Sequence, residues 1–202
     1  MAEAPRLNRL ESGLRGAADA LAARPWALVG GLAVSARCEP RFTRDIDLAV
    51  AVANDGEAEA LVHSLLGSGY RVLATVEHEK RRRLATVRLG VDGEGPGGIV
   101  VDLLFASSGI EPEIASAATS LEVLPSLTVP VARVGDLIAL KLLSRDARRP
   151  QDEADLNALL PVADAAELAR ARESVQLITT RGFDRGRNLV ADLTALLSTR
   201  DG

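Results

Sequence analysis

Residues 26–50, WALVGGLAVSARCEPRFTRDIDLAV, carry the pattern that decides the fold. A short apolar strand over Trp26–Val29 ends at two glycines, and a short helix is expected over 32–38. The strand expected over 45–52 alternates, so its two aspartates project from one face and its apolar side chains from the other. This stretch is therefore expected to fold as strand, glycine turn, helix and strand, an order typical of α/β proteins.

Gly30 and Gly31 stand where the first strand ends and the helix is expected to follow. Backbone N–H groups at such a turn can approach an anion closely, and a helix N-terminus favours negative charge. A tight turn that needs a residue at positive φ explains the same pair. The residues around the glycines must decide between a phosphate cradle and a simple turn.

Three aspartates stand where an apolar core would be expected. Asp45 and Asp47 lie two residues apart on one strand, and Asp102 interrupts the apolar strand expected over 99–105. Like charges this close repel, and a buried unpaired carboxylate is costly, unless a cation lies between them. Mg²⁺ prefers such oxygen ligands, with water and phosphate completing its shell. Two of the aspartates also have a simpler explanation when taken alone: Asp45 can cap a strand or pair with Arg44, and Asp102 can satisfy a backbone turn.

The secondary-structure patterns change character near residue 131. Before it, helices are expected over 6–23, 58–66 and 111–118, and strands over 70–76, 84–91, 99–105, 121–124 and 127–131. After it only helical patterns occur, over 133–147, 152–160, 165–180 and 186–198. We therefore expect an α/β (α+β) fold, with a small mixed-sheet core over 1–131 and a C-terminal helical bundle over 132–202 that closes a cleft against it.

Lysine is rare: of the 24 Lys and Arg residues, only Lys80 and Lys141 are lysine. Lys141 follows Ile138, Leu137 and Val134 at helical spacing, so a lone charge stands on or beside an apolar stripe. A lysine there can cover the edge of the core with its stem. It can also extend a compact ammonium toward an anionic ligand. The residues alone leave both interpretations open.

Two acidic residues follow that lysine in ARRPQDEADLNALL, residues 147–160. Asp152 suits the N-cap of a helix that follows Pro150, with Asp155 assisting three residues further on. Asp152 also suits a site in which it orients Lys141 or an acceptor. The two interpretations are compatible.

Lys80, Arg81, Arg82 and Arg83 form the dense basic run of the sequence. The run falls between two expected strands, so a solvated hairpin tip explains it. A loop of this charge also suits contact with the phosphates of a nucleic-acid acceptor. The net charge of −4, from 24 basic and 28 acidic residues, argues against nonspecific nucleic-acid binding by the whole surface.

The composition excludes several classes of protein. Hydrophobic residues at 47% and charged residues at 26% are typical of a globular chain. No apolar run approaches the ~20 residues of a membrane span, and the N-terminus lacks the apolar region of a signal peptide, so the cytoplasm is the expected location. Cys38 is the single cysteine, which excludes an internal disulfide and a cysteine zinc site. Aromatic residues at 2% disfavour base-stacking platforms.

The block WALVGGLAVSARCEPRFTRDIDLAV resembles the nucleotidyltransferase superfamily typified by DNA polymerase beta. The signature of that superfamily is a strand, Gly-Gly or Gly-Ser, a short helix, Asp-x-Asp, and a third Asp on a later strand. The form GGLA…RFTRDIDL is more specifically similar to the AbiEii/AbiGii group, the toxin half of type IV toxin–antitoxin pairs, and the resemblance covers residues 26–160. Many superfamily members have Ser after the first glycine, where this chain has Gly31.

The resemblance implies an enzyme that moves a nucleoside monophosphate from an NTP to an acceptor hydroxyl, with Mg²⁺ or Mn²⁺. Asp45, Asp47 and Asp102 are implied as catalytic metal ligands for an in-line displacement by two-metal logic. Lys141 is implied as the cation that neutralises the triphosphate, with Asp152 beside it. The residues implied to bind the nucleotide are Gly30, Gly31, Arg44 and Lys141.

The resemblance also bears on partners. Related toxins modify tRNA ends, which implies a tRNA acceptor, contacted by the basic run 80–83, and a cognate antitoxin protein. Within enzymes, the alternative is a nucleotidyltransferase that modifies a hydroxyl of an aminoglycoside or lincosamide antibiotic. In another class, the alternative is a non-catalytic relative that binds a nucleotide or a protein. The intact set of carboxylates argues against that last alternative.

Overall fold

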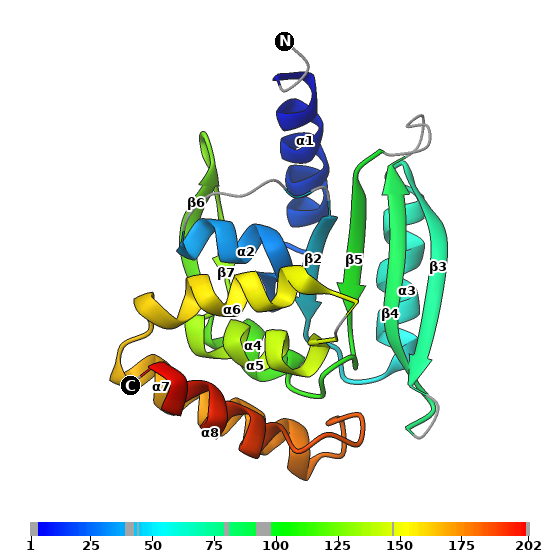
Figure 1. Cartoon of the computed structure of the whole chain (residues 1–202). Helices are drawn as coiled ribbons and strands as arrows, with labels where there is room; N and C mark the ends of the chain where they lie inside the picture. The colour runs from blue at the N-terminus through cyan, green and yellow to red at the C-terminus, as the bar shows by residue number, and fades with distance from the viewer. Residues whose placement is uncertain are drawn as a thin grey trace.

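The structure is a computed structural model of the chain, and it describes residues 4–38, 43, 45–78, 81–91, 98–146 and 148–200. Over these residues the chain forms eight helices and one seven-stranded sheet (Figure 1). The strands are β1 (Trp26–Val29), β2 (Asp45–Val50), β3 (Tyr70–His78), β4 (Arg83–Val91), β5 (Val100–Leu104), β6 (Thr119–Leu124) and β7 (Leu127–Val131). The helices are α1 (Ala4–Ala20), α2 (Gly30–Arg37), α3 (Asp55–Leu66), α4 (Glu111–Ala117), α5 (Val134–Ser144), α6 (Pro150–Val162), α7 (Ala165–Thr180) and α8 (Leu189–Arg200).

The sheet is mixed, with the strand order β3-β4-β5-β2-β1-β7-β6. β1 runs antiparallel to β2, whereas β2 and β5 are parallel, as are β1 and β7. Consecutive strands β3 and β4 form an antiparallel hairpin at one edge, and β6 and β7 form another at the opposite edge. The prediction of a mixed-sheet α/β core followed by helices is confirmed.

The alternation predicted for β2 separates core from site. Ile46, Leu48 and Val50 are fully buried, while Asp45 and Asp47, which alternate with them, project from the other face. Figure 1 shows α2, α5 and α6 in front of the sheet and α3 behind β3 and β4. The site face of the central strands is therefore covered by helices from both halves of the chain.

Helix α5 lies at the centre of the helical half. It packs against α2, α6, α7 and α8, and its apolar residues Leu137, Ile138 and Leu142 are fully buried. A helix that is apolar all round is expected to be surrounded by other elements. This position takes Lys141 into the interior rather than to the surface. No helix formed by the described residues has the length and apolarity needed to cross a bilayer.

Candidate active site

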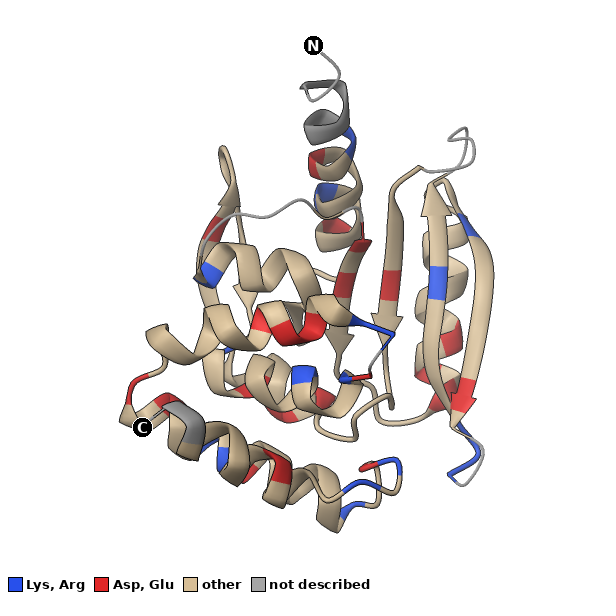
Figure 2. Ribbon diagram, in the orientation of Figure 1, with Lys and Arg blue, Asp and Glu red and all other residues tan. Residues whose placement is uncertain are grey.

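Three side chains form a row across the sheet. In the register of the parallel pair β2 and β5, Asp47 lies directly opposite Asp102. In the antiparallel pair β4 and β5, Arg88 lies directly opposite Asp102. Figure 2 shows these acidic positions on β2 and β5 beside a basic position on β4. Because paired residues of neighbouring strands share a face, the three side chains meet, and Asp45 follows two residues away on that face.

Asp102 is already paired with an arginine. Arg88 donates from Nε to Oδ1 at 2.9 Å and from Nη2 to Oδ2 at 2.6 Å, so both carboxylate oxygens accept from one guanidinium. Such a bidentate pair is the strong form of an ion pair. Sequence analysis missed Arg88, although a signal existed: in LATVRLGV it is the one charge within an apolar strand. Like Asp102, Arg88 is a single charge within an apolar strand, which indicates that it has a partner of opposite charge.

Asp47 is the carboxylate of the row whose pKa is strongly raised. Burial, followed by the charges of Asp102 and Asp45, raises the pKa of Asp47 to about 7. Lys141 and Arg88 act in the opposite direction, but they do not offset the burial. Over the part of the chain that the structure describes, Asp47 therefore has no cation of its own, whereas Asp102 has one.

Gly30 gives Asp47 the space it occupies. Gly30 has φ +64, and a Cβ added there would overlap the carboxylate of Asp47. The glycine is thus required both by its backbone conformation and by the close approach of that side chain. The helix was predicted to begin at Leu32, but α2 begins at Gly30. The two glycines that were expected to form a turn before the helix are its first two residues. No side chain of the described residues caps this helix N-terminus, so its N–H groups remain available.

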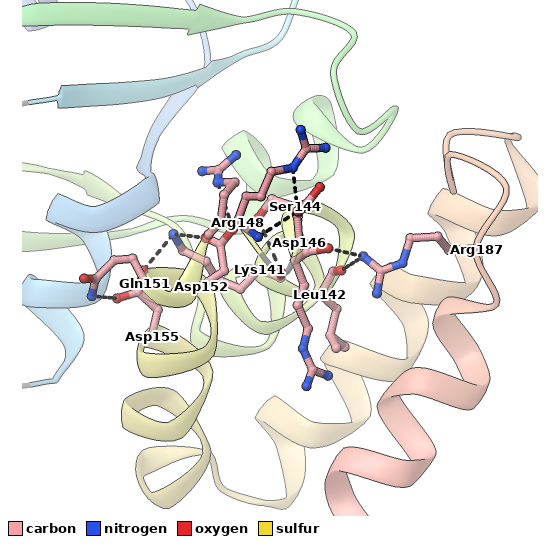
Figure 3. A network of polar contacts seen from close by, with 11 residues as sticks. Lys141, Leu142, Ser144, Asp146, Arg148, Gln151, Asp152, Asp155 and Arg187 are labelled. Atoms are coloured by element: carbon pink, nitrogen blue, oxygen red, sulfur yellow. Dashed lines mark hydrogen bonds and ion pairs between the residues drawn. The ribbon is translucent and has the colours of Figure 1, made fainter.

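Lys141 is paired, which corrects the expectation of a lone charge. Its Nζ lies 3.1 Å from Oδ1 of Asp152 and 2.7 Å from Oδ2 of Asp155 (Figure 3). Lys141 is only 8% exposed and each aspartate 1%, so the lysine does not extend its stem toward water. Two buried carboxylates hold its ammonium in a fixed direction, which a single hydrogen bond would not do.

The alternative that Asp152 caps helix α6 is wrong. The helix begins at Pro150, a residue that is favourable at the first helical position, and Arg149 occupies the N-cap position without a side-chain capping bond. Asp152 lies inside the first turn and faces Lys141, with Nε of Arg149 3.1 Å from its Oδ2. Its place in the helix is therefore set by a tertiary ion pair, which no local rule would reveal.

A cleft of about 390 Å³ brings the predicted site residues together. From the sheet side it is lined by Gly30, Gly31, Asp45, Asp47 and Asp102. From the helical half it is lined by Lys141, Asp152, Arg149 and Arg185. The cleft thus carries three carboxylates and Arg88 on the sheet wall, and three cations and Asp152 on the helical wall.

Arg149 and Arg185 were not singled out by sequence reasoning. Burial, and then the charges of Arg149 and Arg187, lower the pKa of Arg185. Arg185 forms no ion pair among the described residues, although the charge of Glu111 acts on it, so this end of the cleft has positive charge to offer an anion. Arg149 lies within the ARRPQDEADL segment that the sequence analysis singled out, whereas Arg185 lies in a loop whose place in the fold no pattern predicted.

The residues present fit a divalent cation in part. Asp45 and Asp47 supply the hard oxygen ligands that Mg²⁺ prefers, and the raised pKa of Asp47 reflects like charges that a cation would offset. Among the described residues, however, no three His, Cys, Asp or Glu side chains are grouped as a metal site, and both oxygens of Asp102 are engaged by Arg88. The three-carboxylate metal site therefore stays a prediction.

The remaining predicted positions lie elsewhere. Arg44 and Lys80 fall outside the described residues. Arg81 and Arg82 form the turn between β3 and β4, as the hairpin-tip interpretation predicts. Arg81 donates to the carbonyl of Arg181, and Nε of Arg83 lies 2.7 Å from Asp55 Oδ1. None of the three turn arginines lines the cleft.

The fold and the cleft define a class of protein. A glycine turn at a helix N-terminus, an Asp-x-Asp strand, a third aspartate beside it and a buried lysine opposite them face one cleft. These are the parts that the resemblance found in the sequence predicts for a nucleotidyltransferase. The sequence matches the family described as "Nucleotidyl transferase AbiEii toxin, Type IV TA system" over residues 13–199, and the chain therefore belongs to that family. The predicted resemblance is confirmed, and the enzyme class is that of nucleotidyl transfer.

Solved structures of similar architecture include JHP933 from Helicobacter pylori. It is 17% identical, with a TM-score of 0.47, over 95% of this chain and 88% of that one. The antibiotic-resistance factor ANT(2'')-Ia is 19% identical, with a TM-score of 0.45, over 99% and 94% of the two chains. The lincosamide antibiotic adenylyltransferase LnuA is 14% identical, with a TM-score of 0.40, over 68% and 87%. A search of curated proteins found no match to the chain.

Proposed function

We propose that this chain is the toxin of a type IV pair and transfers a nucleoside monophosphate from an NTP to a hydroxyl of tRNA, with a divalent cation. The observation that carries the proposal is the meeting of Asp47 and Lys141 in one cleft, from opposite halves of the chain. In this proposal residues 1–131 form the catalytic core and residues 132–202 close over the nucleotide. We place the reaction in the cytoplasm, where NTPs and tRNA are found.

The wall of the cleft formed by α2 would hold the phosphates. Backbone N–H groups at Gly30 and Gly31 lie at a helix N-terminus, where negative charge is favoured. Asp45 and Asp47 would hold Mg²⁺, which neutralises phosphate charge and lowers the pKa of an attacking hydroxyl when bound. The acceptor oxygen attacks the α-phosphorus, the bond to the β-phosphate oxygen breaks, and pyrophosphate leaves.

The helical wall would stabilise the leaving group. Lys141 lines the cleft while Asp152 and Asp155 fix the direction of its ammonium, so it needs no reorganisation when charge develops on the triphosphate. Arg185 lines the same cleft without an acid partner among the described residues, and would add positive charge there. Asp152 acts in this scheme as a positioning residue for the lysine.

The proposed acceptor of the nucleoside monophosphate is tRNA. The family description names a type IV toxin, and the arginines of the β3–β4 turn suit the phosphates of RNA. The same family description supports a cognate antitoxin protein as a partner. Arg83 already pairs with Asp55 and Arg81 donates to the carbonyl of Arg181, so Arg82 is the described turn residue available to the acceptor.

The test is to incubate the chain with Mg²⁺, total RNA and each of four NTPs labelled at the α-phosphate. The proposal expects label from at least one NTP to appear in an RNA of tRNA size. Asp47→Asn should abolish the labelling, and Asp19→Asn, an exposed carboxylate on α1, should leave it intact. Label transferred to an added aminoglycoside or lincosamide, and not to RNA, would replace the tRNA acceptor with an antibiotic.

A further inference from the structure

Arg88 occupies the cation position of the third carboxylate. Both oxygens of Asp102 accept from its guanidinium, at 2.9 and 2.6 Å, and strand register places the two residues directly opposite each other. The sheet itself fixes this pair, because Arg88 and Asp102 lie in the middle of the paired stretch of β4 and β5. A divalent cation at Asp102 and the guanidinium of Arg88 would need the same two oxygen atoms.

The two partners differ in what they lose on separation. The side chain of Arg88 is 49% exposed, whereas that of Asp102 is 8% exposed. Arg88 can therefore turn into solvent at little cost, since an exposed guanidinium is hydrated by water. Asp102 cannot be hydrated in place, and it needs another cation when the arginine leaves.

The neighbouring carboxylates behave differently. Among the described residues, Asp45 and Asp47 form no hydrogen bond or ion pair with Arg88, which acts on Asp47 only through its positive charge. A cation held by Asp45 and Asp47 would therefore compete with no ion pair formed by the described residues. Over those residues, the row across the sheet has one cation position that is open and one that Arg88 fills.

We propose that Arg88 is a resident counter-cation of Asp102, which a divalent cation must displace, and that it restricts the nucleotide-free protein to a single cation at Asp45 and Asp47. The inference rests on the proposed function, because it takes this cleft as the metal-binding and nucleotide-binding site. Arg88 is thus a positioning residue that sets metal stoichiometry. The displaced guanidinium stays at the cleft, which Arg88 lines, and phosphate oxygens are suitable partners for it.

The experiment is a Mn²⁺ titration of the full chain without nucleotide, with free Mn²⁺ followed by its electron paramagnetic resonance signal. Wild type should bind one Mn²⁺ per chain. Arg88→Gln should bind a second Mn²⁺, or bind it about tenfold more tightly, because the competing charge is gone. Arg83→Gln is the matched control, since Arg83 lies on the same strand and pairs with an acid outside the cleft. It should titrate like wild type.

Two further variants keep the inference testable if Arg88→Gln folds poorly. Arg88→Lys keeps the charge without the bidentate fork, and it should bind the second ion with intermediate affinity. Arg88→Gln/Asp102→Asn should lose the added site and return to one Mn²⁺ per chain. Thermal unfolding in EDTA checks the fold of each variant. Equal stoichiometry and affinity in wild type and Arg88→Gln would overturn the inference, and so would a second site that survives Asp102→Asn.

The titration separates this inference from the proposed function. It uses neither nucleotide nor acceptor, so a second Mn²⁺ in Arg88→Gln supports the inference even if no RNA is labelled. If RNA is labelled while Arg88→Gln titrates like wild type, the proposed function stands and the role of Arg88 fails. A wild-type chain that binds no Mn²⁺ would count against both.

Discussion

Lys141 is a buried charge whose burial depends on the two buried carboxylates beside it. Its ammonium lies within 3.1 Å of Asp152 and 2.7 Å of Asp155, all three side chains being buried. Burying a charge is tolerable only when it is paired and hydrogen-bonded, so each member of this group requires the others. Removing one member therefore affects stability as well as chemistry.

Lys141→Gln should both destabilise the protein and slow nucleotidyl transfer. Two buried carboxylates would lose their main cation, which costs about 3 kcal/mol of unfolding free energy. Single-turnover transfer should fall on the order of 10²-fold, because the charge acts mainly in the transition state. Urea unfolding and a rapid-quench assay measure the two effects.

A compensating variant separates the two effects. Lys141→Gln/Asp155→Asn removes one of the stranded charges and leaves Asp152 with Arg149, so much of the lost stability should return. The transfer rate should stay low. If the double variant also recovers the rate, Lys141 supports the fold only.

Asp47 makes stability depend on pH in the metal-free protein. Its pKa is about 7 in the folded chain, above the ordinary aspartate value of about 4. The folded state therefore holds a proton that the unfolded state has released, and the free energy of unfolding falls as pH rises between these two values. Asp47→Asn cannot ionise, so it should be more stable than wild type at pH ~8, by roughly 1–2 kcal/mol, and similar to it at pH ~4.

Urea unfolding in EDTA across this pH range tests the sign. Parallel curves for wild type and Asp47→Asn would contradict the origin assigned to the raised pKa. Added Mn²⁺ at the high-pH end should stabilise wild type more than Asp47→Asn, since a ligand that binds the folded state raises its stability.

At this scale the sequence reveals charges that are out of place, but not their partners. Asp102 and Lys141 stand out because each interrupts an apolar pattern. Their partners Arg88 and Asp152 depend on strand register and helix packing, which are long-range properties. That is why the pairs Arg88–Asp102 and Lys141–Asp155 were not predicted, whereas Asp152 was expected beside Lys141 only through the resemblance and as one of two interpretations. The catalytic roles of these residues remain predictions.

At the scale of elements, local patterns place the strands well. β1 begins and ends where predicted, and the alternation of β2 correctly separates its aspartates from its core residues. Helix starts were less predictable where tertiary contacts compete with capping rules, as at Gly30 and Pro150. Packing between helices was not accessible from periodicity, because it depends on which faces meet.

Gly135 decides how closely α5 and α7 can approach. A Cβ added there would overlap the backbone carbonyl of Glu167 and the backbone nitrogen of Ala171. The N–H of Gly135 also donates to Glu167 Oε2 at 2.8 Å. Since α5 carries Lys141, this contact helps to set where the ammonium lies.

Gly135→Ala should lower the free energy of unfolding by about 1–3 kcal/mol, because backbone atoms cannot move aside as side chains do. The transfer rate should also fall as α5 shifts. Gly67→Ala is the matched control: Gly67 has φ −67, and the nearest atoms, the backbone carbonyls of Ser64 and His63, would lie at 3.4 and 4.0 Å from the added Cβ. Its change should stay within about 0.5 kcal/mol. Equal urea midpoints for the two variants would rule out the close contact as a determinant.

At the scale of the whole molecule, the charge is uneven: a chain of negative net charge carries a local group of basic residues. The chain carries −4, yet Figure 2 shows basic residues gathered at the β3–β4 turn and at the loop between α7 and α8. The two segments touch, because Arg81 donates to the carbonyl of Arg181 and lies 5.6 Å from the ring centre of Phe183. A cationic edge beside an otherwise acidic protein favours local rather than general contact with a polyanion.

Arg82 is the residue that tests this edge. It is exposed, it has no acid partner among the described residues, and its φ of 49 is a conformation that asparagine tolerates. Arg82→Asn therefore removes the charge with little effect on the turn. If the proposed RNA acceptor crosses this turn, the dependence of log K on log salt should become shallower by about 0.7, the value for one phosphate contact in a single strand.

The comparison variant is Arg83→Gln. Arg83 begins β4 and is held by Asp55 at 2.7 Å, so its charge is already neutralised and its loss should leave the salt slope unchanged. RNA binding measured by filter retention over a range of salt concentrations gives both slopes, and NTP binding should be unaffected in either variant. The same slope in wild type and Arg82→Asn would return the basic turn to a solvated hairpin tip, and the acceptor would then have to approach the cleft from the side of Arg149 and Arg185.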